Sequence, residues 1–387
     1  MNTTSASPSS HGPLTGIRVI EFAGIGPGPF AGMMLADMGA EVIVIERCSD
    51  IRPNSPRVAM NRGKRSIALD LKTDSGRDAA WRLLATADVL IEGFRPGVME
   101  RLGFGPDAVH ARNAKLIYGR MTGWGQTGPL AQAAGHDINY VALTGVLDIS
   151  ARPGQLPVIP PSIVGDMGGG AMFLAFGIVC ALLETRQSGK GQVIDASIVD
   201  GVAALSALVH TLRGVEFWRD DPEHNFFLNT SPFYEVFECA DGLAITLGAI
   251  EPQFYAELLQ RLGLSDVDPI HQYDSRQWPL LKARVAALIK TRSRDEWCAL
   301  LEGSDVCFAP VLSLEQAPRH PHNAERGVFV EVNGKQQPAP APRFSRTPAR
   351  PPGAGTHAGE DTDAILAELG YDAEHIVRLR NMQYASL

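Results

Sequence analysis

The chain has 387 residues, of which 45% are hydrophobic and 20% are charged, and its formal net charge is −8. This length predicts two domains, and the composition is typical of a globular protein. The acidic balance excludes an overall basic surface for nucleic acid, so we expect no nucleic-acid partner.

The cysteines, the two ends of the chain and its longest apolar run indicate where in the cell the protein is located. The five cysteines are far apart and lack CxxC spacing, which favours free thiols in a cytoplasmic protein over a disulfide framework or a zinc site. Residues 1–11 lack the charged and apolar regions of a signal peptide and predict a disordered lead. The longest apolar run, Ala171–Leu183, is shorter than the roughly 20 residues that span a bilayer, so we expect no membrane partner. The final Ala385-Ser386-Leu387 faintly resembles a peroxisomal signal, but a chance ending is the preferred interpretation.

The N-terminal part predicts a βαβ unit. Strand Ile17–Phe22 leads through the turn Gly24–Pro29 into helix Phe30–Met38 and strand Glu41–Glu46. The turn has G-x-G-x-G spacing, and Glu46 lies where a ribose-binding acid would sit. However, the third glycine is wrongly spaced, and the two prolines of the turn lack N–H groups that would hold a pyrophosphate. We therefore expect a Rossmann-like shape without a dinucleotide.

A cluster of basic residues follows this unit. Its members are Arg47, Arg57, Arg62, Lys64, Arg65 and Lys72. In an acidic protein, cations gathered at strand ends suit a phosphorylated ligand. The alternative is a solvated surface, where most Lys and Arg lie.

Strands and helices continue to alternate through the first third of the chain. The expected elements are strand Ser66–Asp70, helix Asp74–Asp88 capped by Asp74, strand Val89–Ile91, and strand Leu116–Tyr118. This order predicts a mostly parallel, doubly wound sheet, whose ligands bind beyond the carboxyl ends of the strands. The glycine-rich loop Met121–Pro129 follows such an end and lets backbone approach a ligand. It leads to Ala134–Tyr140, where an imidazole, a carboxylate, an amide and a phenol stand too close together for core material.

The next glycine-rich stretch, Gly165–Gly170, opens onto the apolar helix Ala171–Glu184. Asp166 is interpreted either as an ordinary helix N-cap or as an acid–base group. The glycines after it remove side-chain bulk and so open room for something else. Strand Gln192–Asp195 and helix Ser197–Leu212 complete the first part of a large domain at 12–212.

Beyond a linker at 213–231, the pattern changes to a small α+β domain at 232–318. Strands Tyr234–Glu238 and Leu243–Leu247 flank an Asp-Gly turn, a strong hairpin signal. We then expect helices Gln253–Leu262, Trp278–Thr291 and Arg294–Glu302, the last capped by Ser293, and a final strand, Val306–Leu312. A Pro-rich return linker at 319–360 precedes C-terminal helices at 361–387 that dock on the large domain. The fold class is therefore α/β, with a Rossmann-like large domain and a smaller α+β domain.

Three acid–base candidates lie in polar or glycine-rich breaks: His136, Asp166 and Glu251. Each also has a structural explanation. His136 suits a hydrogen-bonded structural histidine, Asp166 a cap, and Glu251 a favourable charge at a helix N-terminus. Residue patterns alone do not bring the three together.

Motifs along nearly the whole chain are similar to those of a known family. They are Gly24–Pro29, Arg62–Ser66 with Leu69–Lys72, Gly93–Val98 with Arg101–Gly103, Thr122–Gln126, Ala134–Tyr140, Ser188–Val193, Gly248–Phe254 and Pro340–Arg346. With these the chain resembles the family III CoA-transferase superfamily and, within it, the α-methylacyl-CoA racemases. The most specific motif is Gly-His-Asp-Ile-Asn-Tyr, because transferase members generally lack its histidine.

The resemblance implies an interlocked homodimer with its active site between the large domain of one chain and the small domain of the other. It implies a racemase that inverts the α-carbon of 2-methyl-branched acyl-CoA thioesters, with His136 and Asp166 as the acid–base pair and Glu251 as a supporting carboxylate. It requires no metal and no cofactor, since CoA is part of the substrate. The implied acyl-CoA contacts are Arg47, Leu69, Asp70, Leu71, Lys72, Gly93, Phe94, Arg95, Arg101, Gly135, Asp137, Ile138, Asn139 and Tyr140.

One departure from the family pattern lies before the small-domain aromatic pair, where Asn229-Thr230 replaces Gly-Gly. If this loop lines the acyl pocket, the preferred acyl chain differs. The alternative function is a CoA-transferase in which Asp166 attacks the acyl group as a nucleophile. A dinucleotide-dependent oxidoreductase is less favoured because of the two prolines in the turn. A non-catalytic acyl-CoA-binding protein is less favoured because the chain has three matching acid–base positions.

Overall fold

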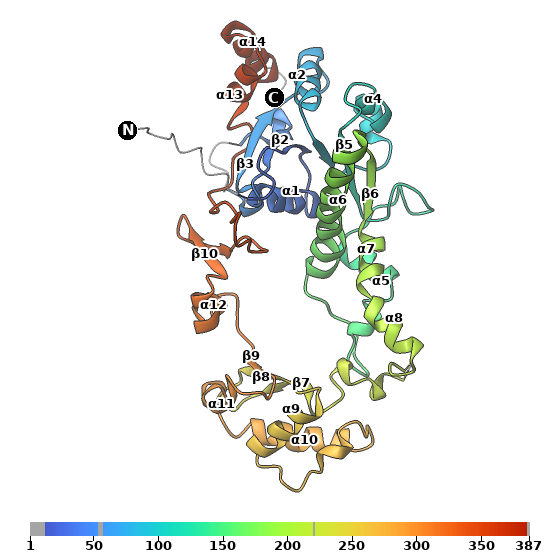
Figure 1. The fold of residues 1–387 in the computed structure, drawn as a ribbon, viewed down its shortest axis with the longest axis vertical. Helices are drawn as coiled ribbons and strands as arrows, with labels where there is room; N and C mark the ends of the chain where they lie inside the picture. Colours follow the sequence, from blue (N-terminus) through green and yellow to red (C-terminus); the bar gives the residue numbers. More distant parts are fainter. Residues whose placement is uncertain (1–11, 53–56, 220, 385–387) are drawn as a thin grey trace. The chain divides into compact units, whose positions relative to one another are not determined.

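The computed structural model describes residues 12–52, 57–219 and 221–384, with side chains described up to Leu379 (Figure 1). The expected lead at 1–11 and the terminal tripeptide lie outside the described residues. Internal contacts divide the chain into two units. Unit 1 contains the described residues up to 144, residues 160–205 and those from 324 onward, and unit 2 contains 145–159 and 206–323. The segment 145–159, expected in the large domain, therefore belongs to unit 2.

Unit 1 is built on a parallel sheet of six strands in the order β3-β2-β1-β4-β5-β6. The strands are β1 (Arg18–Phe22), β2 (Glu41–Glu46), β3 (Lys64–Ala68), β4 (Val89–Glu92), β5 (Ile117–Thr122) and β6 (Val193–Ser197). The order confirms the Rossmann-like expectation. It reverses between β1 and β4, so the connections after these strands diverge and leave a crevice beyond their carboxyl ends.

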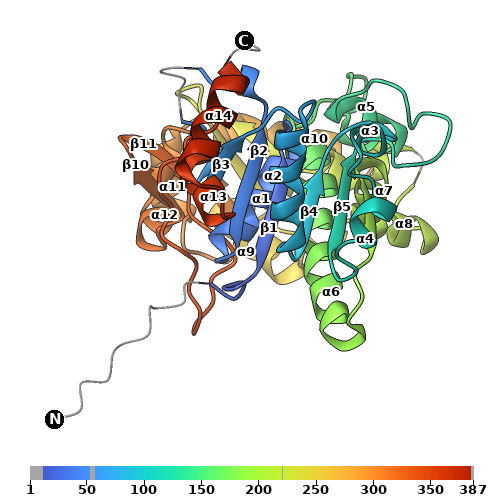
Figure 2. The ribbon, with the colours of Figure 1, turned by 90° about the horizontal axis from the view of Figure 1, so that it is seen from above.

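Helices cover both faces of this sheet (Figure 2). The helices of unit 1 are α1 (Pro27–Asp37), α2 (Asp74–Ala85), α3 (Val98–Leu102), α4 (Pro106–His110), α5 (Asp137–Leu143), α6 (Phe173–Ser188), α7 (Ile198–Leu205), α13 (Thr362–Glu368) and α14 (Ala373–Tyr384). On one face, Leu83 and Leu84 of α2 share a buried core with Ile365 and Leu366 of α13. On the other, α6 packs on β5 because Gly119 leaves room for Leu174.

Several element boundaries differ from expectation. Helix α2 is capped by Thr73, whose Oγ1 accepts the Gly76 N–H at 3.1 Å, because Asp74 is already its first helical residue. The expected helix 197–212 is two helices, α7 and α8 (Ala207–Gly214). The return segment contains an antiparallel hairpin, β10 (Phe329–Val332) and β11 (Lys335–Pro338). Its Asn333-Gly334 turn, with both φ values positive, is a hairpin signal that our prediction overlooked.

Unit 2 contains an antiparallel sheet in the order β7-β8-β9 and a set of helices. The elements are β7 (Tyr234–Glu238), β8 (Ala244–Gly248), β9 (Phe308–Pro310), α8, α9 (Pro252–Arg261), α10 (Trp278–Ile289) and α11 (Arg294–Leu301), with α12 (Pro321–Glu325) at the boundary with unit 1. The β7–β8 hairpin is confirmed, and so is the Ser293 cap, whose Oγ accepts the Glu296 N–H at 3.3 Å. The core is rich in aromatic rings, with Phe233 and Trp297 fully buried.

One helical run is longer than expected from its apolar stretch. Ile163–Ser188 is a continuous helical run of 26 residues, π-helical over Ile163–Met172 and α-helical afterwards, with mean hydropathy 1.8 over its most apolar window. By length and composition alone it is long enough to cross a membrane, whereas the apolar stretch Ala171–Leu183 by itself is too short. Buried helices of globular proteins pass the same test, and 44% of this window is buried within the structure.

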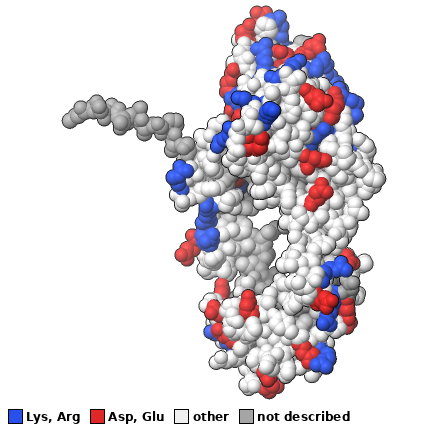
Figure 3. Space-filling model, turned by 45° about the vertical axis from the view of Figure 1, so that its right-hand side comes forward, with Lys and Arg blue, Asp and Glu red and all other residues white. Residues whose placement is uncertain are grey.

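Charged side chains are unevenly distributed over unit 1. Figure 3 shows both signs gathered over the end formed by α2, α13 and α14. Because positive and negative groups alternate there, this face presents no field of a single sign.

Candidate active site

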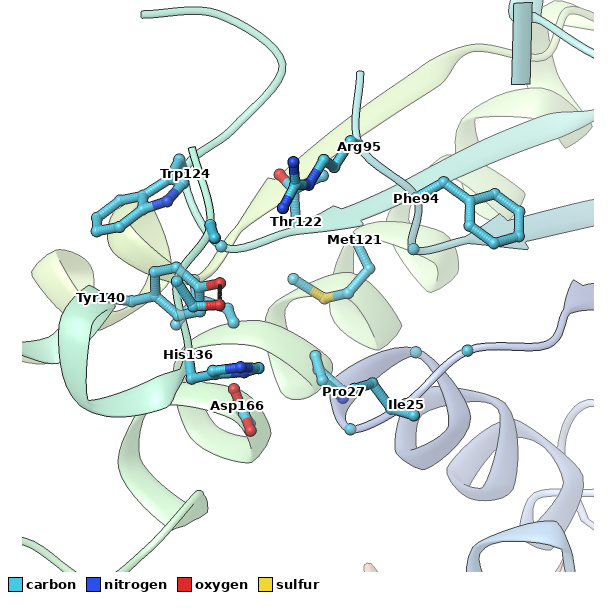
Figure 4. Close-up of a pocket in the computed structure, with 18 of the residues that line it drawn as sticks. Ile25, Pro27, Phe94, Arg95, Met121, Thr122, Trp124, His136, Tyr140 and Asp166 are labelled. Carbon is cyan, nitrogen blue, oxygen red and sulfur yellow. Dashed lines mark hydrogen bonds between the residues drawn. The ribbon is translucent and has the colours of Figure 1, made fainter. Parts of the chain in front are cut away.

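A cavity of about 510 Å³ lies in unit 1 beyond the carboxyl ends of β1, β4 and β5 (Figure 4). It occupies the crevice that the strand order creates. Its lining residues are Phe22, Gly24–Pro29, Ile91, Gly93–Pro96, Met121–Trp124, Ala131, Ala133–His136, Tyr140, Asp166 and Ile198. Loops from three strands, the residues before α5 and the π-helical segment thus converge on one space.

His136 and Asp166 lie next to each other at this cavity, as Figure 4 shows. His136 is exposed and immediately precedes α5, where its backbone N–H donates to Asn139 Oδ1 at 3.0 Å. Asp166 is not an N-cap, since it lies inside the π-helical segment Ile163–Met172. A long π-helical stretch is rare and is often found at functional sites.

The neighbouring Asp137 fixes the position of Asp166. Its Oδ1 accepts the Asp166 N–H at 2.8 Å, and its Oδ2 accepts the Ser162 N–H at 3.3 Å. The side chain of Asp137 is therefore buried against the π-helical segment. Of the backbone N–H groups near Asp137 and Asp166 that could stabilise an enolate, the one on Asp166 is already occupied.

Burial raises the pKa of the Asp166 carboxyl, and the nearby Asp137 charge raises it further. A hydrogen bond with the Ser162 side chain and the proximity of His136 oppose this shift. The pKa remains raised, so the environment favours the protonated form of Asp166 more than water would.

The glycines on both sides of Asp166 serve packing, because protein atoms take up the room that their missing side chains leave. A Cβ at Gly169 would lie 2.5 Å from Val202 Cγ2, and one at Gly165 would lie 2.2 Å from Asp137 Oδ1. At Gly170 a Cβ would be 3.2 Å from Pro27. Protein atoms fill the space that these glycines leave, which lets α7 and α1 approach the segment that carries Asp166.

The loop after β5 supports an aromatic pair at the cavity. The rings of Trp124 and Tyr140 meet edge to face with centroids 4.7 Å apart, and the Tyr140 hydroxyl donates to the Gly135 carbonyl. A Cβ at Gly123 would lie 2.0 Å from the Tyr140 ring. Gly123 is thus required for this packing. Through its hydrogen bond to Gly135, Tyr140 stabilises the segment before His136.

The basic cluster does not face the cavity as a group. Arg62 and Lys64 are buried and bound to Asp37 at 2.6 Å and Glu21 at 2.8 Å, so the idea that they bind phosphate is wrong. Two further pairs are Arg57–Glu360 and Arg65–Glu368. The remaining cations predicted to contact acyl-CoA, Arg47, Lys72, Arg95 and Arg101, are exposed.

The other residues predicted to contact acyl-CoA differ in whether they reach the cavity. Gly93, Phe94, Arg95, Gly135 and Tyr140 line the cavity. Ile138 and Asn139 are exposed, and Asp70 and Leu71 are partly buried. The Leu69 side chain is in the core, so it offers a ligand only its backbone.

Glu251 belongs to unit 2, whereas His136 and Asp166 belong to unit 1. It is the exposed N-cap residue of α9. Its loop is held by Gln272, whose Nε2 donates to the carbonyls of Ala249 and Ile250, both at 2.9 Å. This support was not predicted, because it comes from a residue beyond α9.

The departure from the family pattern also lies in unit 2. Asn229 has a φ of 58°, in the left-handed region that Asn tolerates better than most residues. Its carbonyl accepts a hydrogen bond from Lys282, and the Thr230 hydroxyl donates to the Asn225 carbonyl at 2.9 Å. The loop thus keeps a glycine-like backbone while carrying larger side chains. Among the described residues, no group of three or more His, Cys, Asp or Glu side chains is arranged to hold a metal ion.

Comparison with known proteins identifies relatives over nearly the whole chain. The model of CoA-transferase family III matches residues 14–362. The alpha-methylacyl-CoA racemase of Mus musculus is 44% identical over 371 residues, which cover 95% of this chain and 96% of that protein. The Homo sapiens racemase is 41% identical over 370 residues, with the same coverage of 95% and 96%. A CAIB/BAIF family protein from Brucella suis has a similar crystal structure, with a TM-score of 0.81 and 28% identity over 93% of this chain and 100% of that one.

Proposed function

The chain belongs to CoA-transferase family III and has its fold, and we propose that within this family it is a racemase of 2-methyl-branched acyl-CoA thioesters. The observation that carries the proposal is His136 beside a half-buried Asp166 with a raised pKa at one cavity. Two relatives at 44% and 41% identity bear the name alpha-methylacyl-CoA racemase, which supports the same activity here. The enzyme is accordingly an isomerase.

The two groups suit an inversion by proton transfer. In one direction, neutral His136 removes the α-proton, and the electron pair of the broken C–H bond moves into the thioester carbonyl to give an enolate. Protonated Asp166 then delivers its proton to the opposite face of the α-carbon. The enzyme is left with imidazolium and carboxylate, which is the starting state for the reverse reaction.

The raised pKa of Asp166 bears directly on this scheme. Inversion needs one group protonated while the other is not, and a carboxyl with an ordinary pKa would be ionised near neutral pH. Burial and the adjacent Asp137 charge shift Asp166 toward the protonated form. The backbone N–H of Asp137, at the first position of α5, remains a candidate donor to the enolate oxygen.

The CoA part of the substrate supplies negative charge and length. We propose that the exposed cations Arg47, Lys72, Arg95 and Arg101 contact its phosphates, since Arg and Lys bind phosphate through charge-assisted hydrogen bonds. Arg95 lines the cavity itself. The thioester end would then enter between the loops after β4 and β5.

We extend the proposal to an interlocked homodimer in which Glu251 of one chain supports the cavity of the other. Large apolar side chains on the run Ile163–Ser188 are exposed, among them Phe176 at 70% and Leu183 at 56%. Sizeable exposed apolar surfaces mark interaction sites on globular proteins. A monomer mass in analytical ultracentrifugation at micromolar concentration would contradict the dimer.

We also propose a location for the protein and an acyl preference. The five free cysteines support a cytoplasmic location, which cell fractionation would test. The larger side chains of Asn229 and Thr230 support an acyl preference that differs from that of relatives with Gly-Gly. A panel of 2-methylacyl-CoA esters of different chain length would measure that preference.

The second candidate is a CoA-transferase, because the family model carries that name. In that reaction Asp166 would attack the acyl carbonyl, release CoA thiolate and form a mixed anhydride. That route needs no second base opposite Asp166, so His136 at the same cavity argues against it.

One experiment separates the candidates. The protein is incubated with a single epimer of a 2-methylacyl-CoA in deuterated water without an acceptor acid. The racemase predicts deuterium at the α-carbon and a mixture of epimers, measured by mass spectrometry and chiral separation. No exchange across several 2-methylacyl-CoA esters would overturn the proposal, whereas transfer of CoA to an added carboxylate would favour the transferase.

A further inference from the structure

The loop Gly93–Pro96 forms one wall of the cavity and carries Arg95. It joins the end of β4 to α3 and has no regular secondary structure. Its position therefore depends on side chains that reach it from elsewhere.

Glu92, the last residue of β4, holds the start of this loop. Its carboxylate is fully buried, and its Oε2 accepts the Phe94 N–H at 2.8 Å. The other oxygen, Oε1, accepts the Nε–H of Arg120 at 2.9 Å. Arg120 lies directly opposite Glu92 in the register of β4 with β5.

The same guanidinium holds the far side of the loop. Its two terminal nitrogens donate to the carboxylate of Glu100 on α3, at 2.9 and 3.3 Å. Arg120 itself is only 7% exposed. One side chain thus joins the residue before the loop to the helix after it, and Arg is suited to this because its donors form a rigid planar fork.

The loop is also tied to the segment that leads to His136. Gln132 Nε2 donates to the Pro96 carbonyl at 3.1 Å. Gln132 lies between Ala131 and Ala133, which both line the cavity. This hydrogen bond therefore joins the loop to the part of the cavity wall formed by Ala131 and Ala133.

We infer that Arg120 is a positioning residue for acyl-CoA: by holding Glu92 and Glu100 together it fixes Phe94 and Arg95 at the cavity wall. The inference rests on the proposed function, because that function supplies the ligand of the loop. Arg120 does not line the cavity, so it acts through the loop and not by contact with substrate.

The test compares two buried arginines that each bind a carboxylate through two nitrogens. Arg120→Lys keeps the charge but cannot span both carboxylates, and Arg62→Lys makes the same change at the Arg62–Asp37 pair, away from the cavity. For each variant the dissociation constant of free CoA is measured by calorimetry, together with KM, kcat and the thermal midpoint. Arg120→Lys should weaken CoA binding and raise KM about ten- to hundredfold, with kcat changed much less. Arg62→Lys should lower the thermal midpoint without moving KM.

Three outcomes would be informative. Equal CoA affinity in Arg120→Lys and the wild type would overturn the inference, whatever happens to stability. If Arg120→Lys does not fold, Glu100→Gln takes its place. Glu100 is partly exposed, and this substitution leaves Glu92 in contact with Arg120. An unchanged KM in Glu100→Gln would equally overturn the inference. Failure of the wild type itself to bind CoA would instead overturn the proposed function.

Discussion

Two regions of unit 1 use the same kinds of side chain in opposite ways. In the β3-β2-β1 half, Arg62 binds Asp37 through two nitrogens, at 3.0 and 2.6 Å, and both residues are buried. At the cavity beyond β1, β4 and β5, His136 is exposed and Asp166 is half-buried. Ionisable groups whose hydrogen bonds are filled by protein hold the fold, and those that face a cavity are available for proton transfer.

The contrast between these two regions predicts how substitutions in each should act. Changes at the cavity should remove activity without destabilising the fold, and changes at the buried pair should destabilise the fold without removing activity. A loss of both activity and stability at either place would contradict this division of roles.

The largest expected effect is at the cavity. His136→Ala should lower the rate of epimerisation by about 10²- to 10⁴-fold, the usual contribution of a general acid–base group. Because Asp166 remains, one epimer should still exchange its α-proton for deuterium, with retention of configuration. Chiral analysis and mass spectrometry of the same reaction measure the two effects separately.

The exposed position of His136 predicts a thermal midpoint within a few degrees of the wild type. His322→Ala, another exposed histidine, provides the control and should change neither property. Wild-type epimerisation by His136→Ala would remove this residue from the mechanism.

The next effect is at the buried pair. Arg62→Met leaves the Asp37 carboxyl buried without its cation, which should lower the free energy of unfolding by about 3–5 kcal/mol. Urea denaturation measures the loss, and the folded variant should keep its kcat and KM.

Burial already raises the pKa of Asp37 and Arg62 opposes that shift, so the pKa of Asp37 should rise further in the Arg62→Met variant. Protonation then relieves the buried charge, and the stability difference should shrink as the pH falls through that raised pKa. A loss below about 1 kcal/mol would place Arg62 among the weak surface pairs.

The sequence predicted the fold better than the site. The short β-rich runs of unit 1 and the Asp-Gly hairpin of unit 2 are local patterns, and the structure confirms them. Arg62 and Lys64 were misinterpreted because their partners lie 25 and 43 residues away, and a charge cannot be recognised as buried until its partner is known. The roles of Asp137 and Arg120 were missed for the same reason, since both depend on long-range contacts.

The pairing of His136 with Asp166 came from a family resemblance and not from spacing. The local pattern made Asp166 an ordinary cap, because a glycine-rich stretch before an apolar helix is typical of a helix start. The π-helical segment that holds Asp166 depends on close packing against α7, where a Cβ at Gly201 would lie 1.8 Å from the Gly169 carbonyl oxygen. Such packing cannot be inferred from either segment alone.

The smallest expected effect is on stability, at the half-buried carboxyl of Asp166. Burial raises the pKa of Asp166 above its ordinary value of 3.8, so its ionised form is less favourable in the folded state than in the unfolded state. Its contribution to stability is therefore greatest below the unfolded pKa and is lost as the pH rises through the folded pKa. Asp166→Asn removes this penalty, so the variant should be inactive in epimerisation yet melt up to a few degrees higher than the wild type at neutral pH. Thermal melts of both proteins from about pH 4 to pH 8 measure the difference, which should vanish at the acid end. A lower midpoint for Asp166→Asn at every pH would show that this carboxylate stabilises the fold, and the contrast between the two regions would not hold there.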